Sequence, residues 1–186
     1  VYARQSKGVF FLRIEDTDQK RMVEGGIENI VSVLHGFDIL PTEGYSFGGK
    51  YGSYQQSERA EIYQTYVKDL IKQGLAYPCF MTEEELNNIR EEQEINKVRT
   101  GVYGIYAVDR DLSLEEIKEK LARGEEYVIR LKSPGDASKT IEVVDCIKGK
   151  MKFPEHDTDT VLLKKNGIPT YHFAHAIDDH LMHTTH

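Results

Sequence analysis

The stretch VFFLRIEDTDQKR (residues 9–21) joins a short apolar run to a group of charged side chains. Its first six residues are nearly all apolar, which is typical of a buried strand. Asp and Thr follow, and both can begin a helix by accepting hydrogen bonds from its first free N–H groups. Apolar residues then recur at helical spacing up to residue 35, although Gly25 and Gly26 weaken the first half of that helix. The pattern predicts a strand followed by a helix, the start of a β-α unit in an α/β fold.

Five charged residues surround the predicted end of this strand, namely Arg13, Glu15, Asp16, Asp18 and Arg21. In α/β sheets the strand ends line the crevice where ligands bind, so a ligand site is one interpretation. A helix cap with ion pairs on the surface explains the same residues without a ligand. The spacing alone leaves both interpretations open.

Composition narrows the class of protein. The chain has 186 residues, 39% of them hydrophobic, and a formal net charge of -7. It suits one domain, or one domain with an insertion. We find neither an apolar run of the ~20 residues that cross a bilayer nor a signal peptide, and two cysteines make no disulfide framework. These features predict a cytoplasmic protein. Because the chain opens on Val1, in what looks like the end of a helix, we expect a fragment.

The rest of the chain predicts further helices and strands. A helix is expected after Ser57, ending at Gly74, and capping boxes at residues 82–85 and 113–116 predict two short charged helices. Residues 127–132 and 141–147 are predicted strands, and residues 160–165 and 168–173 a hairpin turning at residues 166–167. The last residues are expected to become helical around Ala176. We interpret residues 78–155 as an inserted α+β subdomain between residues 1–77 and 156–186.

Two stretches suggest ligand chemistry. Residues 44–50, GYSFGGK, fit a phosphate-binding P-loop, but Tyr51 replaces its Ser or Thr and no helix is expected next. A surface loop explains them better. Five histidines, His172, His175, His180, His183 and His186, crowd the end of the chain beside two aspartates, as in a transition-metal site. Neither helical nor strand spacing makes all five converge. A His-rich metal-binding module therefore stays an alternative.

Lys and Arg are frequent between residues 97 and 152, where Tyr103, Tyr106 and Tyr127 also occur. Such a face can bind the phosphates of RNA, although a mixed solvated surface explains the charges as well. A plain RNA-binding module is thus a further alternative. The net negative charge argues against a nucleic-acid surface over the whole protein.

Five segments, taken in order, together resemble the glutamyl-tRNA synthetases, a family of class I aminoacyl-tRNA synthetases. They are FFLRIEDTD (10–18), YGSYQQSER (51–59), GLAYPCFMTEEEL (74–86), EEYVIRLK (125–132) and GIPTYHFAHAIDDHLMHTTH (167–186). The resemblance runs collinearly over essentially the whole chain. It implies a Rossmann-like catalytic core, here incomplete, with an inserted α+β subdomain that binds the tRNA acceptor stem.

The resemblance also implies an activity and its partners. The family activates L-glutamate with ATP and magnesium (Mg2+), and transfers glutamate from glutamyl-adenylate to the 3′ end of tRNA(Glu). A monomeric parent enzyme without zinc or membrane association is implied. The HIGH-type and KMSKS-type motifs, which act on ATP, would lie outside this chain. We therefore expect the 186 residues alone to form no adenylate.

Site residues follow from the same resemblance. Glu15 matches the glutamate that holds the substrate's α-amino group, and Tyr171 matches a tyrosine of the amino-acid pocket. His175 stands where many relatives have Asn and the glutaminyl relatives have His, so its role stays open. Three residues match positions near the terminal adenosine of tRNA: Asp18, Arg21 and Asp179. No metal ligand is implied. A paralogue that glutamylates queuosine in tRNA shares this catalytic domain, but typically has a cysteine-rich zinc site where this chain has only Cys79.

Overall fold

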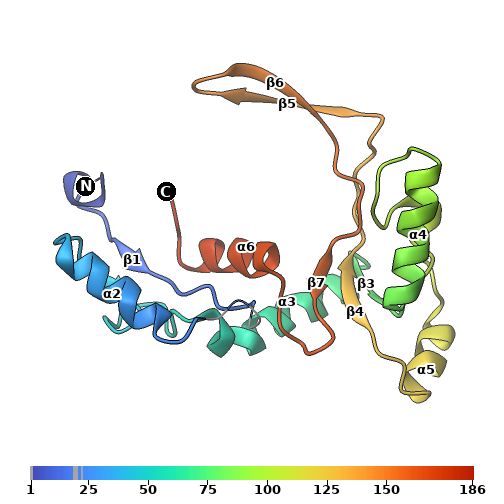
Figure 1. The fold of residues 1–186 in the computed structure, drawn as a ribbon, viewed down its shortest axis with the longest axis horizontal. Helices are drawn as coiled ribbons and strands as arrows, with labels where there is room; N and C mark the ends of the chain where they lie inside the picture. The colour runs from blue at the N-terminus through green and yellow to red at the C-terminus, as the bar shows by residue number, and fades with distance from the viewer. Residues whose placement is uncertain (1, 19–20, 22) are drawn as a thin grey trace. The chain divides into compact units, whose positions relative to one another are not determined.

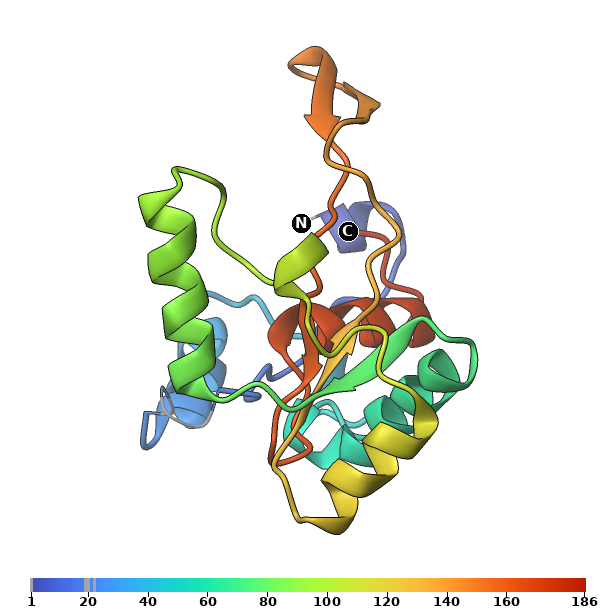
Figure 2. The same ribbon diagram turned by 90° about the vertical axis from the view of Figure 1, so that its right-hand side faces the viewer.

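The computed structural model describes residues 2–18, 21 and 23–186. They form two compact units (Figures 1 and 2). Unit 1 contains residues 1–65 and 167–186, and unit 2 contains residues 66–166. The chain thus leaves unit 1, builds the whole of unit 2 and returns. Within the described residues, no helix is long and apolar enough to cross a membrane.

Unit 1 begins with helix α1 (Tyr2–Gln5), strand β1 (Phe11–Leu12), helix α2 (Gly26–Gly36) and strand β2 (Glu43–Gly44). Strands β1 and β2 are parallel, with Phe11 opposite Glu43. The predicted β-α start is confirmed, but the strand is shorter than residues 9–14. Helix α2 begins only after Gly25, whose φ of 69° lies in the left-handed region that glycine adopts easily. The start of the predicted helix, in the half that Gly25 and Gly26 were expected to weaken, is therefore not part of α2.

The pairing of β1 with β2 depends on Gly44. A Cβ atom at this position would lie 2.3 Å from the backbone oxygen of Leu12, and the φ of Gly44 is 127°. Only glycine combines this conformation with so close an approach of two backbones. The stretch considered as a P-loop starts here, forms a turn that bridges Gly44 to Gly48, and leads into more loop instead of a helix.

Two further helices complete unit 1. A 3-10 turn, η2 (Gln56–Arg59), leads into α3 (Ala60–Lys72), which continues into unit 2. Ser57 does not cap α3 as predicted, because the helix begins later. Helix α6 (Tyr171–Leu181) occupies the segment for which the second strand of a hairpin was predicted, so that hairpin and the later helix start near Ala176 are wrong. Thr170, in extended conformation, precedes Tyr171, the first helical residue.

Unit 2 contains an antiparallel sheet in the order β3 (Ala76–Cys79), β4 (Val128–Leu131), β7 (Val161–Leu163). Tyr77, Cys79 and Met81 form its core cluster, against which Leu86 and Ile89 pack. Those two residues belong to α4 (Glu83–Ile95), and α5 (Leu114–Ala122) follows the short turn η3 (Gly104–Tyr106). Both predicted capping boxes are confirmed, at the start of α4 and of α5.

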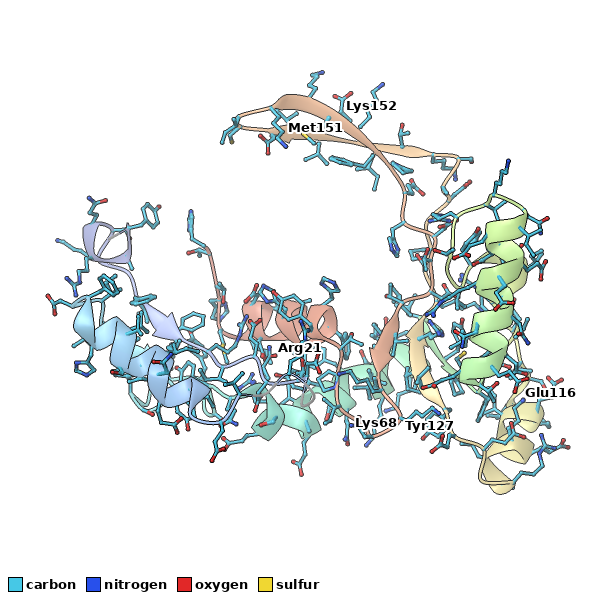
Figure 3. The ribbon with its side chains drawn as sticks, in the orientation of Figure 1. Arg21, Lys68, Glu116, Tyr127, Met151 and Lys152 are labelled. Carbon is cyan, nitrogen blue, oxygen red and sulfur yellow. The ribbon has the colours of Figure 1, made fainter. Side chains whose placement is uncertain are left out.

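A long hairpin, β5 (Thr140–Asp145) and β6 (Gly149–Pro154), extends from the sheet of unit 2 (Figures 1 and 2). Only the first of these strands was predicted. Successive side chains alternate between the two faces of the ribbon, so Met151 and Lys152 belong to opposite faces (Figure 3). The face of Met151 also carries Ile141, Val143 and Phe153, and each of these three residues is about half exposed.

Candidate functional site

The candidate site lies in unit 1 and is built around the side chain of Arg13, which is only 7% exposed. Its Nη2 atom donates to Glu15 Oε1 at 2.7 Å, and its Nη1 atom donates to Asp179 Oδ1 at 2.9 Å. Burial opposes the charge of Arg13, but the hydrogen bonds to these two carboxylates outweigh it and the pKa of Arg13 is raised. A permanently charged guanidinium thus joins the end of the 13–15 segment to helix α6.

His175 connects the same two carboxylates from the side of α6. Its Nε2 atom lies 2.8 Å from Asp179 Oδ2, one helical turn further on, and its Nδ1 atom lies 3.2 Å from Glu15 Oε1. The Nη2 atom of Arg13 is 3.3 Å from the same Nδ1. A hydrogen on Nε2 satisfies Asp179 and leaves Nδ1 free to accept from Arg13. These four side chains therefore hold one another in place.

With His175 counted as neutral, the charge of this group is not balanced. Arg13 contributes one positive charge, whereas Glu15 and Asp179 contribute two negative charges. The side chains of the two carboxylates are 26% and 31% exposed, so a ligand can reach both while the guanidinium lies beneath them. A site with one uncompensated, accessible carboxylate charge favours a cation that can donate several hydrogen bonds, such as a primary ammonium group.

The ring of Tyr171 extends the site along α6. It lies 5.4 Å from the ring of His175, centroid to centroid, and is about half exposed. Because residues 171, 175 and 179 are spaced four apart, a helix places them along one side. Three residues singled out by the resemblance, Tyr171, His175 and Asp179, thus line one face of α6. Glu15 lies opposite His175, with the two side chains 3.2 Å apart.

Asp18 and Arg21 are arranged differently. Arg21 Nε lies 2.5 Å from Asp18 Oδ2, and the Arg21 side chain is 84% exposed. This ion pair is local, because the two residues are three positions apart in the chain. Asp16 also has a local role, because its carboxylate accepts hydrogen bonds from Gln55 and from the backbone N–H of Ser57. Burial opposes its ionisation, but these bonds outweigh burial and lower its pKa.

A second group of polar side chains, centred on the neighbouring residue of α6, was not predicted. The carboxylate of Asp178 is fully buried and is bound by Arg59, Gln56 and Tyr63. This group could not be predicted from local sequence patterns, because Asp178 and Arg59 are 119 positions apart in the chain. His175 and Asp179 are four positions apart in the sequence, which places them on one side of a helix. That spacing becomes informative only when the helix is known to start at Tyr171.

The histidine-rich end does not form one ligand set. Helix α6 ends at Leu181, and His183 has a left-handed φ of 54°, so His183 and His186 lie beyond the helix that carries His180. In the part of the chain that the structure describes, no group of three or more His, Cys, Asp or Glu side chains is arranged to hold a metal ion. Magnesium finds no fitting site here either, because Glu15 and Asp179 already pair with Arg13.

Comparison with known proteins defines the class. The family model described as tRNA synthetases class I (E and Q), catalytic domain, matches residues 1–186. The chain therefore belongs to the catalytic-domain family of the class I tRNA synthetases for glutamate and glutamine, and its α/β fold is the fold of that family.

Within that family, the similar proteins are glutamate–tRNA ligases. The ligase of Clostridium beijerinckii is 54% identical over 187 residues, covering 98% of this chain and 34% of the relative. The ligase of Acetivibrio thermocellus is also 54% identical, over 99% and 34%. A crystal structure of a glutamate tRNA ligase from Elizabethkingia meningosepticum, in complex with its amino acid, matches with a TM-score of 0.86 and 40% identity, over 100% of this chain and 38% of that chain. The chain spans about a third of the length of these relatives.

Proposed function

We propose that this chain is the part of a glutamate–tRNA ligase that holds the amino group of glutamate during its activation by ATP. In this proposal Glu15 and Asp179 form the negative end of the pocket, and Tyr171 and His175 form its wall. Asp18 and Arg21 face the 3′ end of tRNA(Glu). The observation that carries the proposal is the uncompensated carboxylate charge over buried Arg13. Glu15 matches the family's amino-acid pocket, whereas the resemblance matches Asp179 to a position near the terminal adenosine of tRNA, so the pocket role of Asp179 is an addition made from the geometry.

The charge of the site explains how it would act on an amino acid. Glutamate must keep its α-ammonium group fixed while a carboxylate oxygen attacks the α-phosphorus of ATP. Two oxygen atoms held by Arg13 cannot turn away, because each is fixed by a hydrogen bond of 2.7 or 2.9 Å. A carboxylate fixed in advance binds an ammonium group without a further loss of conformational freedom. The described residues offer no phosphate loop and no magnesium site, so ATP would be held by other residues of the full-length enzyme.

The role of unit 2 is a second part of the proposal. We assign to residues 78–155 the binding of the tRNA acceptor stem, with a cytoplasmic enzyme as its setting. The support is chemical. The hairpin β5–β6 is exposed along nearly its whole length and carries Lys150 and Lys152 on one face. Lysine side chains on an exposed ribbon can contact phosphates.

Substitution of Glu15 tests the proposal in the full-length enzyme. Glu15→Gln keeps the shape of the side chain but removes the charge that would face the ammonium group. We expect a rise in the KM for glutamate of about 10- to 150-fold in ATP–pyrophosphate exchange with tRNA present, since a hydrogen bond to a charged group contributes about 1.5–3 kcal/mol. The KM for ATP should not change.

A matched control is Asp38→Asn, which removes one exposed carboxylate far along the chain from the site and should leave the exchange unchanged. A Glu15→Gln enzyme with the wild-type KM for glutamate would remove Glu15 from the binding site. Exchange with glutamate by the 186-residue chain alone would contradict the expectation that ATP is held elsewhere.

A further inference from the structure

The carboxylate of Asp178 is held from three directions inside unit 1. Its Oδ1 atom accepts a hydrogen bond from Arg59 Nε at 2.9 Å. Its Oδ2 atom accepts one from Gln56 Nε2 at 3.0 Å and another from the hydroxyl of Tyr63 at 2.7 Å. The Asp178 and Arg59 side chains are 0% and 4% exposed. Burial, reinforced by the hydrogen bond to Asp178, raises the pKa of Tyr63, so its phenol stays a donor.

The partners of Asp178 lead back to the segment that carries Glu15. The backbone N–H of Gln56 donates to Ile14 O at 3.0 Å, and the N–H of Ile14 donates to Tyr54 O at 2.7 Å. Arg59 also donates through Nη1 to the backbone oxygens of Tyr51 and Ser53, at 3.1 and 3.2 Å. One side of the cluster is therefore helix α6, and the other side is the chain that pairs with the residue just before Glu15.

Two neighbouring residues of α6 thus make different connections. Asp179 faces Arg13 and His175 in the accessible site, and Asp178 faces the buried cluster of Arg59, Gln56 and Tyr63. Successive residues of a helix differ by about 100° in direction, so both can bind at once only at one rotation of α6 about its axis. Together they fix the rotation and the height of the helix relative to residues 13–15.

Stability alone is a poor explanation for this cluster. A buried ion pair loses its hydration, and well-packed apolar residues in its place are often equally stable or more so. The cluster also leaves Oε1 of Gln56 buried without a hydrogen-bond partner in the described part of the chain, which costs free energy. What apolar side chains cannot supply is direction, because hydrogen bonds of about 3 Å tolerate little displacement.

We propose that Asp178, bound by Arg59, Gln56 and Tyr63, is a positioning residue that sets α6 so that Tyr171, His175 and Asp179 stand opposite Glu15. Asp178 does not touch the substrate. The expected effect of Asp178 on the activation of glutamate rests on the proposed function, whereas its effect on the position of α6 does not. The substitution that tests it is Asp178→Asn, which keeps the size of the side chain but cannot accept from all three donors.

The first measurement is glutamate activation by the full-length enzyme, per active site as counted by titration. For Asp178→Asn we expect kcat/KM for glutamate to fall about 10- to 100-fold, because small displacements of binding groups are costly, while the KM for ATP stays unchanged. Tyr63→Phe, which leaves the ion pair intact, should give a smaller loss in the same direction. A purely structural role predicts fewer active sites with unchanged kinetic constants in those that remain.

A double-mutant cycle separates the two roles further. If Asp178 acts by placing α6 opposite Glu15, then Asp178→Asn and Glu15→Gln together should cost clearly less than the product of their separate effects. Independent, multiplicative effects would overturn the positioning role. Asp38→Asn, on the exposed surface, serves as the control substitution.

Amide hydrogen exchange gives a readout that does not depend on activity. Asp178→Asn should speed exchange at residues 13–16 and 171–181, and leave the sheet of unit 2 unchanged. Unchanged exchange in both segments would overturn the inference, even for an enzyme that activates glutamate. An enzyme that activates no glutamate would overturn the proposed function, and the exchange pattern would still decide the role of Asp178.

Discussion

The hydroxyl of Tyr77 provides a sharp test of how unit 2 is held together. Tyr77 is 6% exposed and donates to Asp159 Oδ2 at 2.8 Å, and Asp159 is fully buried. The other carboxylate oxygen accepts from Arg110 and from the backbone N–H of Ser133. Tyr77→Phe removes one donor from a buried carboxylate and leaves the ring in the core.

The magnitude follows from these contacts. A hydrogen bond to a charged group contributes about 1.5–3 kcal/mol to the free energy of unfolding. The ion pair with Arg110 remains, so the loss should not exceed that range. In a chain of this length each kcal/mol lowers Tm by about 2–4 °C, which gives a decrease of about 3–12 °C.

Thermal unfolding followed by circular dichroism measures this decrease, since the chain has no Trp for fluorescence. The control is Tyr127→Phe in the same unit, where the ring is 40% exposed and keeps its contact with Phe80. Its effect should stay within about 0.5 kcal/mol. Equal Tm values for the Tyr77→Phe and Tyr127→Phe proteins would refute the reasoning that Asp159 needs this donor.

Three further predictions concern stability. Burial, together with carboxylate partners, raises the pKa of Tyr63 and Tyr77 above 10.0. Their contribution to stability is therefore present below pH 10 and is lost as the pH rises further, so in an alkaline titration both should form phenolate only on unfolding. Gly44→Ala, with its Cβ against Leu12, should lower the free energy of unfolding by more than about 1 kcal/mol in urea. Thr82→Ala, which breaks a capping box, should lower it by about 1 kcal/mol in the same assay.

Local signals in the sequence predicted local structure well. The capping boxes at Thr82 and Ser113 were confirmed because each depends on residues three positions apart. The strand and helix after residue 9 were also confirmed, with shorter bounds. Short-range hydrogen bonds and helical spacing are encoded within a few residues, so reading the chain in order is enough to find them.

The wrong predictions arose where contacts between residues far apart in the chain determine the secondary structure. Residues 160–173 alternate like a hairpin around Asn166 and Gly167, but the second half became α6, whose Asp178 is held by Arg59 from another part of the chain. Such a partner has no local signal. The same holds for the candidate site, where the resemblance named Glu15 and Asp179 but only the fold brought them together on Arg13.

Charging of tRNA(Glu) with glutamate tests the proposed function most directly. The most direct test incubates the full-length enzyme with ATP, labelled glutamate and an unmodified tRNA(Glu) transcript, which contains no queuosine. We expect label esterified to the terminal ribose of the transcript, and much less label with the Glu15→Gln enzyme. Labelling that occurs only on tRNA containing queuosine, or no labelling at all, would contradict it.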